Sequence, residues 1–106
     1  FSIAKTLDKD NFKISDVIEK PKTKDAPSNN AVIGRYILDK DIFNFLKNQK
    51  KGKGGEIHIT DAIRKMIFKK YFFIGHRFTG KYLDCGTMNG YIKSGIEISK
   101  LWKFAL

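Results

Sequence analysis

The stretch Asp16-Val17-Ile18-Glu19-Lys20-Pro21 is an apolar run that ends in an acid, a base and a proline. Side chains alternate between the two faces of a strand, so Glu19 and Lys20 leave on opposite faces unless the strand bends there. Pro21 cannot donate to a sheet ladder and favours an extended backbone at Lys20, which predicts that the strand stops with both charges at its end. At the carboxyl end of a strand in an open α/β sheet, such a pair can hold a polar, anionic ligand. The alternative is a surface ion pair with little measurable effect.

The strand that contains this stretch is predicted to run from Phe12 to Lys20. A polar loop, Pro21–Asn30, leads into a second predicted strand, Ala31–Leu38, whose nearly continuous apolar character is typical of a strand covered on both faces. Gly34 lies inside that strand, where it indicates either a bulge or a ligand that approaches the backbone closely. Tyr71–Phe78 is predicted as a third strand.

Three segments have apolar residues at the three-and-four spacing of a helix. The first follows Asp39, which we expect to cap it, and the second is capped by Thr60 or Asp61 and runs to about Lys70. The third starts at Thr87. Its inward side chains are predicted to be Met88, Tyr91, Ile92, Gly95 and Ile96, and the apolar residues from Leu101 to Leu106 are expected to pack on another part of the protein or on a partner.

Composition limits the class of protein. The 106 residues, 42% of them hydrophobic and 13% aromatic, are enough for one globular domain or part of one. No apolar run is long enough to span a bilayer, so no membrane partner is expected, and the first residues lack the pattern of a signal peptide. The single cysteine, Cys85, cannot form an internal disulfide, so the expected location is cytoplasmic.

The formal charge of +10 permits nucleic acid, an anionic membrane or a phosphorylated small molecule as partner. Only Arg35, Arg64 and Arg77 of the 21 basic residues are arginine, whereas proteins that read nucleic acid depend on arginine for bidentate and stacking contacts. The lysines are also spread along the whole chain. These features favour a solvated basic surface, and a basic nucleic-acid-binding module is kept as an alternative.

Two features that suggest a ligand site have simpler interpretations. The loop Asn48–Gly55 is basic and rich in glycine, but it does not end in Gly-Lys-Ser/Thr at the start of a helix, as a phosphate loop does. His58 and His76 have no second histidine or cysteine at the spacing of metal ligands. We therefore expect a flexible basic loop and no histidine metal site.

Four motifs follow one another along the chain. They are Val-Ile-Glu-Lys-Pro (17–21), Ala-Pro-Ser-Asn (26–29) leading to Ile-Gly-Arg-Tyr (33–36), Gly-Glu-Ile-His-Ile-Thr-Asp-Ala-Ile (55–63), and Leu-Asp-Cys-Gly (83–86) with Gly-Tyr (90–91). In this order they resemble the C-terminal part of bacterial UTP–glucose-1-phosphate uridylyltransferases, over about residues 17–98. Glucose-1-phosphate thymidylyltransferases, the sister alternative, share the Glu-Lys-Pro and Leu-Asp-x-Gly elements, whereas Pro-Ser-Asn, Gly-Arg-Tyr and Asp-Cys-Gly favour the uridylyl branch.

The resemblance implies an α/β protein, the C-terminal portion of a Rossmann-like nucleotide-diphospho-sugar transferase with a mixed sheet and flanking helices. It implies an enzyme in which glucose 1-phosphate attacks the α-phosphorus of UTP to give UDP-glucose and pyrophosphate. By resemblance, Lys20 is catalytic and contacts the phosphates, and Glu19 hydrogen-bonds glucose hydroxyls. The backbone from Val32 to Gly34 is expected to lie against the sugar.

Asp84 matches the second magnesium-binding aspartate of this family, so Mg²⁺ is the implied cofactor. Its surroundings in the sequence, a short apolar run before it and Gly86 after it, also suit a carboxylate that points from a strand end into a cleft. The alternative is that Asp84 only shapes the turn at Leu83–Gly86.

The glycine-rich nucleotide-binding loop and the first magnesium aspartate of the family are absent from these residues. The chain begins without methionine, and the strand predicted from Phe12, which follows a turn at Asp8–Asn11, has no evident partner before it. We therefore expect residues 1–106 to be a single partial domain, the sugar-phosphate-binding half, without the N-terminal nucleotide-binding half. Such a fragment is expected to be inactive alone and to belong to a homo-oligomer when complete.

Overall fold

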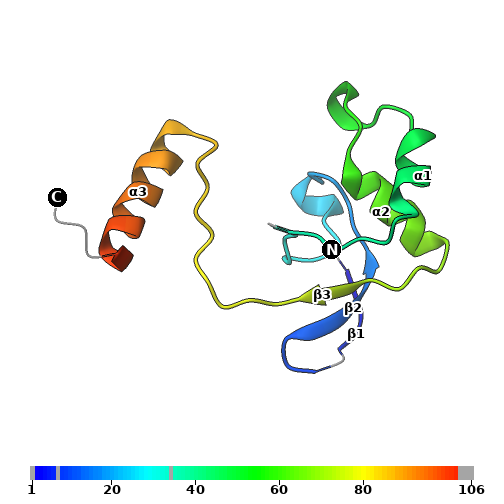
Figure 1. Cartoon of the computed structure of the whole chain (residues 1–106), viewed down its shortest axis with the longest axis horizontal. Helices are drawn as coiled ribbons and strands as arrows, with labels where there is room; N and C mark the ends of the chain where they lie inside the picture. Colours follow the sequence, from blue (N-terminus) through cyan, green and yellow to red (C-terminus); the bar gives the residue numbers. More distant parts are fainter. Residues whose placement is uncertain (1, 7, 34, 103–106) are drawn as a thin grey trace.

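The computed structural model describes residues 2–6, 8–33 and 35–102, which form a mixed α/β structure (Figure 1). The predicted α/β class is confirmed. The strands are β1 (Ser2–Thr6), β2 (Asn11–Asp16) and β3 (Ile74–His76). The α-helices are α1 (Ile42–Lys47), α2 (Ile59–Phe68) and α3 (Met88–Trp102), and two 3₁₀-helices are η1 (Thr23–Asp25) and η2 (Lys53–Gly55).

β2 is the central strand of an antiparallel sheet in the order β1-β2-β3. β1 and β2 form a hairpin in which Asp8 Oδ1 accepts the backbone N–H groups of Asp10 and Asn11, at 2.9 and 2.8 Å. The turn predicted at Asp8–Asn11 is therefore confirmed. The expectation that the following strand lacks a partner in this sequence is wrong, because Ser2–Thr6 pairs with it.

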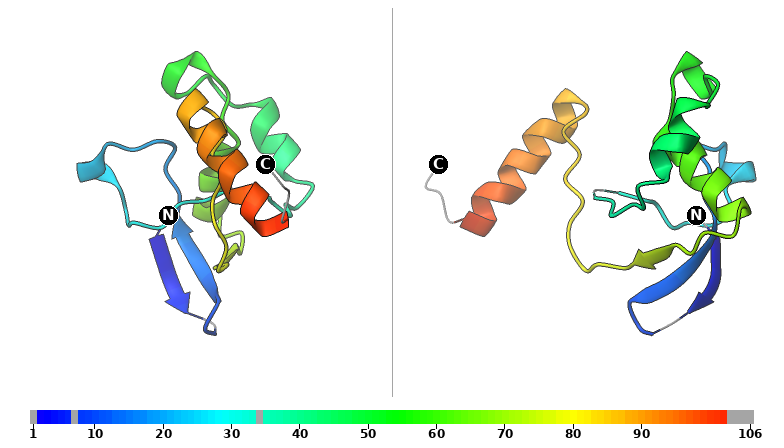
Figure 2. Two further views of the ribbon diagram at one scale, coloured as in Figure 1. Left: turned by 90° about the vertical axis from the view of Figure 1, so that its left-hand side faces the viewer. Right: turned by 45° about the vertical axis from the view of Figure 1, so that its right-hand side comes forward.

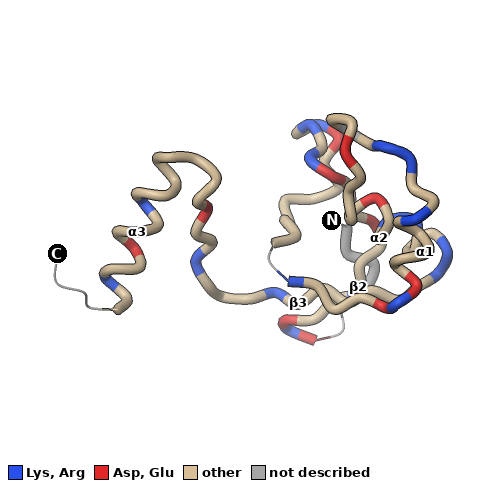
Figure 3. The backbone as a smooth tube through the Cα atoms, turned by 45° about the horizontal axis from the view of Figure 1, so that its top comes forward, with Lys and Arg blue, Asp and Glu red and all other residues tan. Residues whose placement is uncertain are grey.

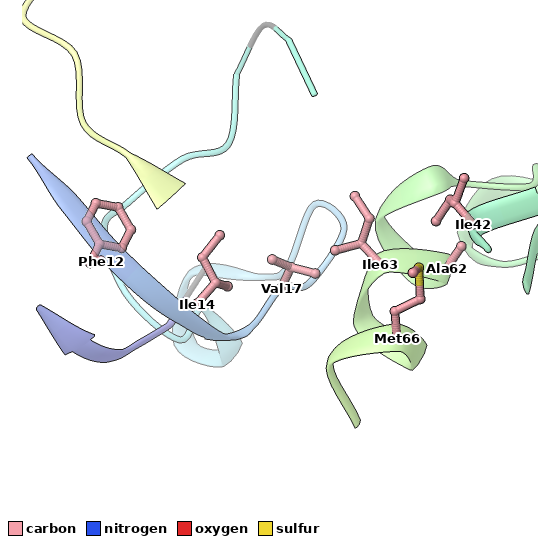
Figure 4. Packing of buried hydrophobic residues seen from close by; sticks show 7 residues of the cluster. All are labelled: Phe12, Ile14, Val17, Ile42, Ala62, Ile63 and Met66. Carbon is pink, nitrogen blue, oxygen red and sulfur yellow. The ribbon is translucent and has the colours of Figure 1, made fainter. Parts of the chain in front are cut away.

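The hydrophobic core lies between β2 and the helices α1 and α2, and Figure 4 shows its side chains in a row from the strand to the helices. The predicted apolar stripe of the second helix is confirmed, since one face of α2 is buried against β2. Burial of an aliphatic side chain stabilises a fold by about 1.5–3 kcal/mol, so this row holds the sheet and the two helices together. The core residues are Phe12, Ile14, Val17, Ile42, Ala62, Ile63 and Met66.

The predicted strands are shorter in the structure. The first ends at Asp16, which pairs with Ser2 at the start of β1, and β3 pairs only with Asn11–Lys13. The buried Val17 that follows breaks the alternation of buried and less buried side chains along β2. The third is a strand only at Ile74–His76, where it lies alongside Asn11–Lys13 of β2. A strand requires a neighbour for its hydrogen bonds, and apolar composition alone does not supply one.

The prediction of a strand at Ala31–Leu38 is wrong for the residues that the structure describes. Residues 31–33 and 35–38 are irregular, with Val32, Tyr36 and Ile37 exposed. The segment pairs with none of the described strands, so its β-branched composition has no ladder to join.

The predicted helices exist, but their starts differ. Asp39 does not cap α1 directly: the N-cap position is Asp41, whose N–H bonds to Asp39 Oδ1 at 2.8 Å. α2 begins at Ile59 with His58 at the N-cap, so the expected cap at Thr60 or Asp61 is wrong, and Phe68 rather than Lys70 ends it. These differences lie within the one or two residues by which helix ends vary.

α3 stands apart from the sheet and the other helices, at the end of an extended segment that leaves β3 (Figure 2). Thr87 starts it as predicted, because Thr87 Oγ1 accepts the N–H of Gly90 at 3.0 Å. The prediction that one face is turned inward is wrong here, because no other part of the chain that the structure describes packs on that face. The side chains predicted to be inward, at Met88, Tyr91, Ile92 and Ile96, are exposed, as is Gly95.

At the other end of α3, Leu101 and Trp102 are also exposed, so the part of the chain that the structure describes does not cover them, and their packing on a partner stays a prediction. The remaining residues of that prediction, 103–106, lie outside the described ranges.

No helix within the described ranges is long and apolar enough to cross a membrane. Figure 3 shows lysine and arginine along the sheet, the helices and the segment before α3, as the sequence predicted.

Candidate functional site

A pocket of about 500 Å³ opens where the chain leaves β2. Its walls are Val17–Pro21, the polar segment from Pro27 to Val32 with Tyr36, and Thr60 at the start of α2. Three of the predicted site residues, Glu19, Lys20 and Val32, therefore lie around one pocket. Gly34, the fourth, lies outside the described residues.

The backbone at Lys20 brings the acid and the base to the same pocket. Lys20 has a φ of 38°, so it adopts a left-handed conformation and not the extended one predicted from Pro21. This conformation costs an L-residue roughly 1–2 kcal/mol, and it turns the chain sharply before Pro21. Glu19 and Lys20 consequently both line the pocket, although a straight strand would place them on opposite faces.

Amide and hydroxyl groups complete the polar wall. Ser28 Oγ accepts the N–H of Asn30 at 3.2 Å, which shapes the turn that presents Asn29 and Asn30 to the pocket. Thr60, at the start of α2, also lines the pocket. A carboxylate, two amides and two hydroxyls can together bind the hydroxyl groups of a sugar, and the lysine can bind an anion.

The sequence interpretation did not assign site roles to Ser28, Asn29, Asn30 or Thr60. The sequence predicts the first three as loop residues and Thr60 as a helix cap. Their signal in the sequence is a cluster of polar side chains in the loop that follows Glu19-Lys20-Pro21, but nothing local indicates that α2 brings Thr60 to the same pocket.

A second hollow, of about 600 Å³, adjoins this pocket and shares six lining residues with it: Val17, Asn29, Asn30, Ala31, Val32 and Tyr36. Core side chains such as Phe12, Ile14 and Ile63 line it. Its largely apolar wall suits packing better than it suits a phosphorylated ligand. The smaller pocket, which contains Glu19 and Lys20, is therefore the candidate site.

Asp84 is not among the residues that line either hollow, and its segment leads away from β3 toward α3 (Figure 1). Its Oδ1 accepts the N–H of Gly86 at 2.9 Å, and the side chain is exposed. The described residues contain no group of three or more histidine, cysteine, aspartate or glutamate side chains that could hold a metal. One exposed carboxylate nevertheless fits a Mg²⁺ ion, which takes one or two protein carboxylates and completes its shell with water and phosphate oxygens.

A concave pocket of this size at the exit of a strand, with a few polar groups and a lysine in its wall, is typical of small-molecule binding sites in α/β proteins. The chain belongs to the Nucleotidyl transferase family, which matches residues 3–100. The family resemblance inferred from the four motifs is confirmed.

Two of the relatives that the chain matches are uridylyltransferases by name. The UTP–glucose-1-phosphate uridylyltransferase of Pseudomonas aeruginosa strain PAO1 is 47% identical over 85 residues, which are 80% of this chain and 30% of the relative. A protein of the same name from Staphylococcus epidermidis is 41% identical over 86 residues, 81% of this chain and 30% of the relative. The chain thus spans about 30% of the length of these relatives.

Solved structures agree. The crystal structure of UDP-glucose pyrophosphorylase complexed with UDP-glucose matches with a TM-score of 0.83 and 47% identity, over 91% of this chain and 36% of that one. The UTP-bound UGPase from Acinetobacter baumannii matches with a TM-score of 0.70 and 32% identity, over 92% of this chain and 32% of that one.

Proposed function

We propose that this chain supplies the sugar-phosphate-binding part of a UTP–glucose-1-phosphate uridylyltransferase. The observation that carries the proposal is the pocket at the end of β2, where Glu19 and Lys20 meet a wall of amides and hydroxyls. The named relatives supply the reaction, in which a phosphate oxygen of glucose 1-phosphate attacks the α-phosphorus of UTP. The bond from that phosphorus to the β-phosphate breaks, so the products are UDP-glucose and pyrophosphate.

The pocket residues have complementary roles in this proposal. Glu19 accepts hydrogen bonds from glucose hydroxyls, and the backbone at Val32 and Gly34 lies against the sugar ring. Lys20 neutralises part of the phosphate charge, which matters because an anionic nucleophile must approach a triphosphate. The enzyme thus acts by positioning and charge neutralisation, with no proton removed from the sugar phosphate.

Mg²⁺ is the proposed cofactor, and Asp84 is the residue of this chain that would hold it. When bound, the cation would screen the charge on the phosphate oxygens. The hydrogen bond from the Gly86 N–H fixes one of the Asp84 carboxylate oxygens. Holding the cation is thus compatible with the turn that Asp84 shapes.

Two further parts of the proposal concern the cellular location of the protein and the rest of the enzyme. We propose a cytoplasmic location, because Cys85 is an exposed free thiol and such thiols persist in reducing compartments. We also propose that the nucleotide-binding contacts come from an N-terminal half of the same domain, and that the complete enzyme is a homo-oligomer.

The test compares two preparations: an enzyme of full family length that carries this segment, and residues 1–106 alone. Each is incubated with glucose 1-phosphate, Mg²⁺ and either UTP or dTTP, and pyrophosphate release is measured. We expect UDP-glucose from the longer polypeptide with UTP and no turnover from residues 1–106. A preference for dTTP would favour the thymidylyltransferase alternative. Binding of duplex DNA that weakens steeply with salt, without turnover of either nucleotide, would favour the nucleic-acid alternative.

A further inference from the structure

Asp16, at the end of β2, and Arg64, in the middle of α2, form a bidentate ion pair. Arg64 Nε donates to Asp16 Oδ1 at 2.8 Å, and Arg64 Nη2 donates to Oδ2 at 3.0 Å. Both side chains are partly buried, with 38% of Arg64 and 23% of Asp16 exposed. Two parallel hydrogen bonds fix the relative orientation of the two groups, which a single contact between flexible surface charges does not.

Each partner is held by a second contact. Asp16 Oδ1 also accepts the N–H of Val17 at 2.8 Å, just where the chain leaves the sheet. The Arg64 guanidinium lies 5.3 Å from the centroid of the Phe68 ring, one turn further along α2. These contacts restrict both side chains to the conformations in which they meet.

The pair joins two segments that contribute to the pocket wall, and neither Asp16 nor Arg64 lines the pocket itself. Val17–Pro21, which carries Glu19 and Lys20, follows Asp16 directly and forms part of the wall. Thr60 also lines the pocket and lies four residues before Arg64, on the same face of α2. The ion pair therefore ties the segment that leaves β2 to the helix that carries Thr60.

We propose that the Asp16–Arg64 pair is a positioning element of the pocket. It holds the backbone of Val17–Lys20 against α2, so that Glu19 and Lys20 face Thr60 at the separation that a sugar phosphate requires. The inference rests on the proposed function for the identity of that ligand. Neither Asp16 nor Arg64 touches the ligand in this scheme, so both act through the residues that they place.

The first experiment uses the full-length enzyme with Arg64→Met, Arg64→Lys and the control Lys65→Met. The control removes a lysine from the same helix, where Lys65 is exposed. Misplacing binding groups weakens a specific complex, so Arg64→Met should raise the KM for glucose 1-phosphate about tenfold and leave the KM for UTP within about twofold. Arg64→Lys keeps the charge without the fork and should give an intermediate value. Lys65→Met should match the wild type.

A second measurement does not depend on turnover. Amide hydrogen exchange of Val17–Lys20 should become faster in Arg64→Met and in Asp16→Asn, and the double variant should be no faster than either single one, because both changes break the same pair. Lys65→Met should leave these amides unchanged.

Unchanged exchange in Arg64→Met, or equal rises in the KM for both substrates, would overturn the positioning role. A KM rise of the same size in Lys65→Met would do the same. If the wild-type enzyme forms no UDP-glucose, the proposed function fails, and the exchange rates alone decide whether the pair positions this segment.

Discussion

Replacing Lys20 separates the contribution of its charge from that of its backbone. The φ of 38° costs an L-residue roughly 1–2 kcal/mol, which both lysine and alanine pay. Glycine avoids that strain but loses about 0.5–1 kcal/mol through the greater freedom of the unfolded chain. Lys20→Gly should therefore have an unfolding free energy up to about 1.5 kcal/mol above that of Lys20→Ala.

Activity should respond differently. Both variants lack the ammonium group, so in the full-length enzyme both should lose about 100- to 1,000-fold in kcat/KM, the scale of removing one preorganised charge stabiliser. Unfolding in urea measures the first quantity, and pyrophosphate release at varied substrate concentrations measures the second.

Lys70 provides the matched control. It too is a lysine with positive φ, 69°, and it lies at the end of α2, where its N–H bonds to the carbonyl of Ile67 at 2.9 Å. The difference in unfolding free energy between Lys70→Gly and Lys70→Ala should be about as large as that between the two Lys20 variants, again in favour of glycine. Both Lys70 variants should keep kcat/KM within about twofold of wild type. Wild-type kcat/KM in Lys20→Gly would leave Lys20 without a catalytic role, and a glycine variant less stable than the alanine variant would refute the strain argument.

Three further predictions test separate parts of the structure. Asp84→Asn keeps the acceptor for the Gly86 N–H, so it should preserve the Tm. The variant should require much more Mg²⁺ for activity and lose about a hundredfold in rate. An unchanged magnesium dependence would return Asp84 to the role of a turn residue. The Tyr71 hydroxyl donates to Asp41 Oδ2 at 2.7 Å, and this hydrogen bond raises the pKa of Tyr71 above 10.0. The stabilisation of the fold by this bond is therefore complete below pH 10.0 and is lost as the pH rises through the folded-state pKa of Tyr71. Tyr71→Phe should remove this alkaline loss in denaturation curves measured at a series of pH values, and an unchanged curve would contradict the assignment. Met66→Ala should cost about 2–5 kcal/mol of unfolding free energy, because Met66 is fully buried between β2 and the helices, whereas the exposed Met88→Ala should cost little.

The sequence by itself determined the features that depend on neighbours along the chain. The apolar stripe of α2, the Asp8–Asn11 turn and the start of α3 at Thr87 arise from hydrogen bonds and packing within a few residues. The motifs from Glu-Lys-Pro to Leu-Asp-Cys-Gly likewise identified the family, and three of the residues that they singled out, Glu19, Lys20 and Val32, line one pocket.

The tertiary structure decided whatever depends on distant partners. Ala31–Leu38 has the composition of a strand, but no described strand lies beside it to accept its hydrogen bonds. Thr60 belongs to the pocket because α2 packs on β2, and Asp16 meets Arg64, 48 residues later in the sequence, only in the folded chain. Such contacts form only when segments far apart in sequence meet, so no local pattern of residues could have predicted them.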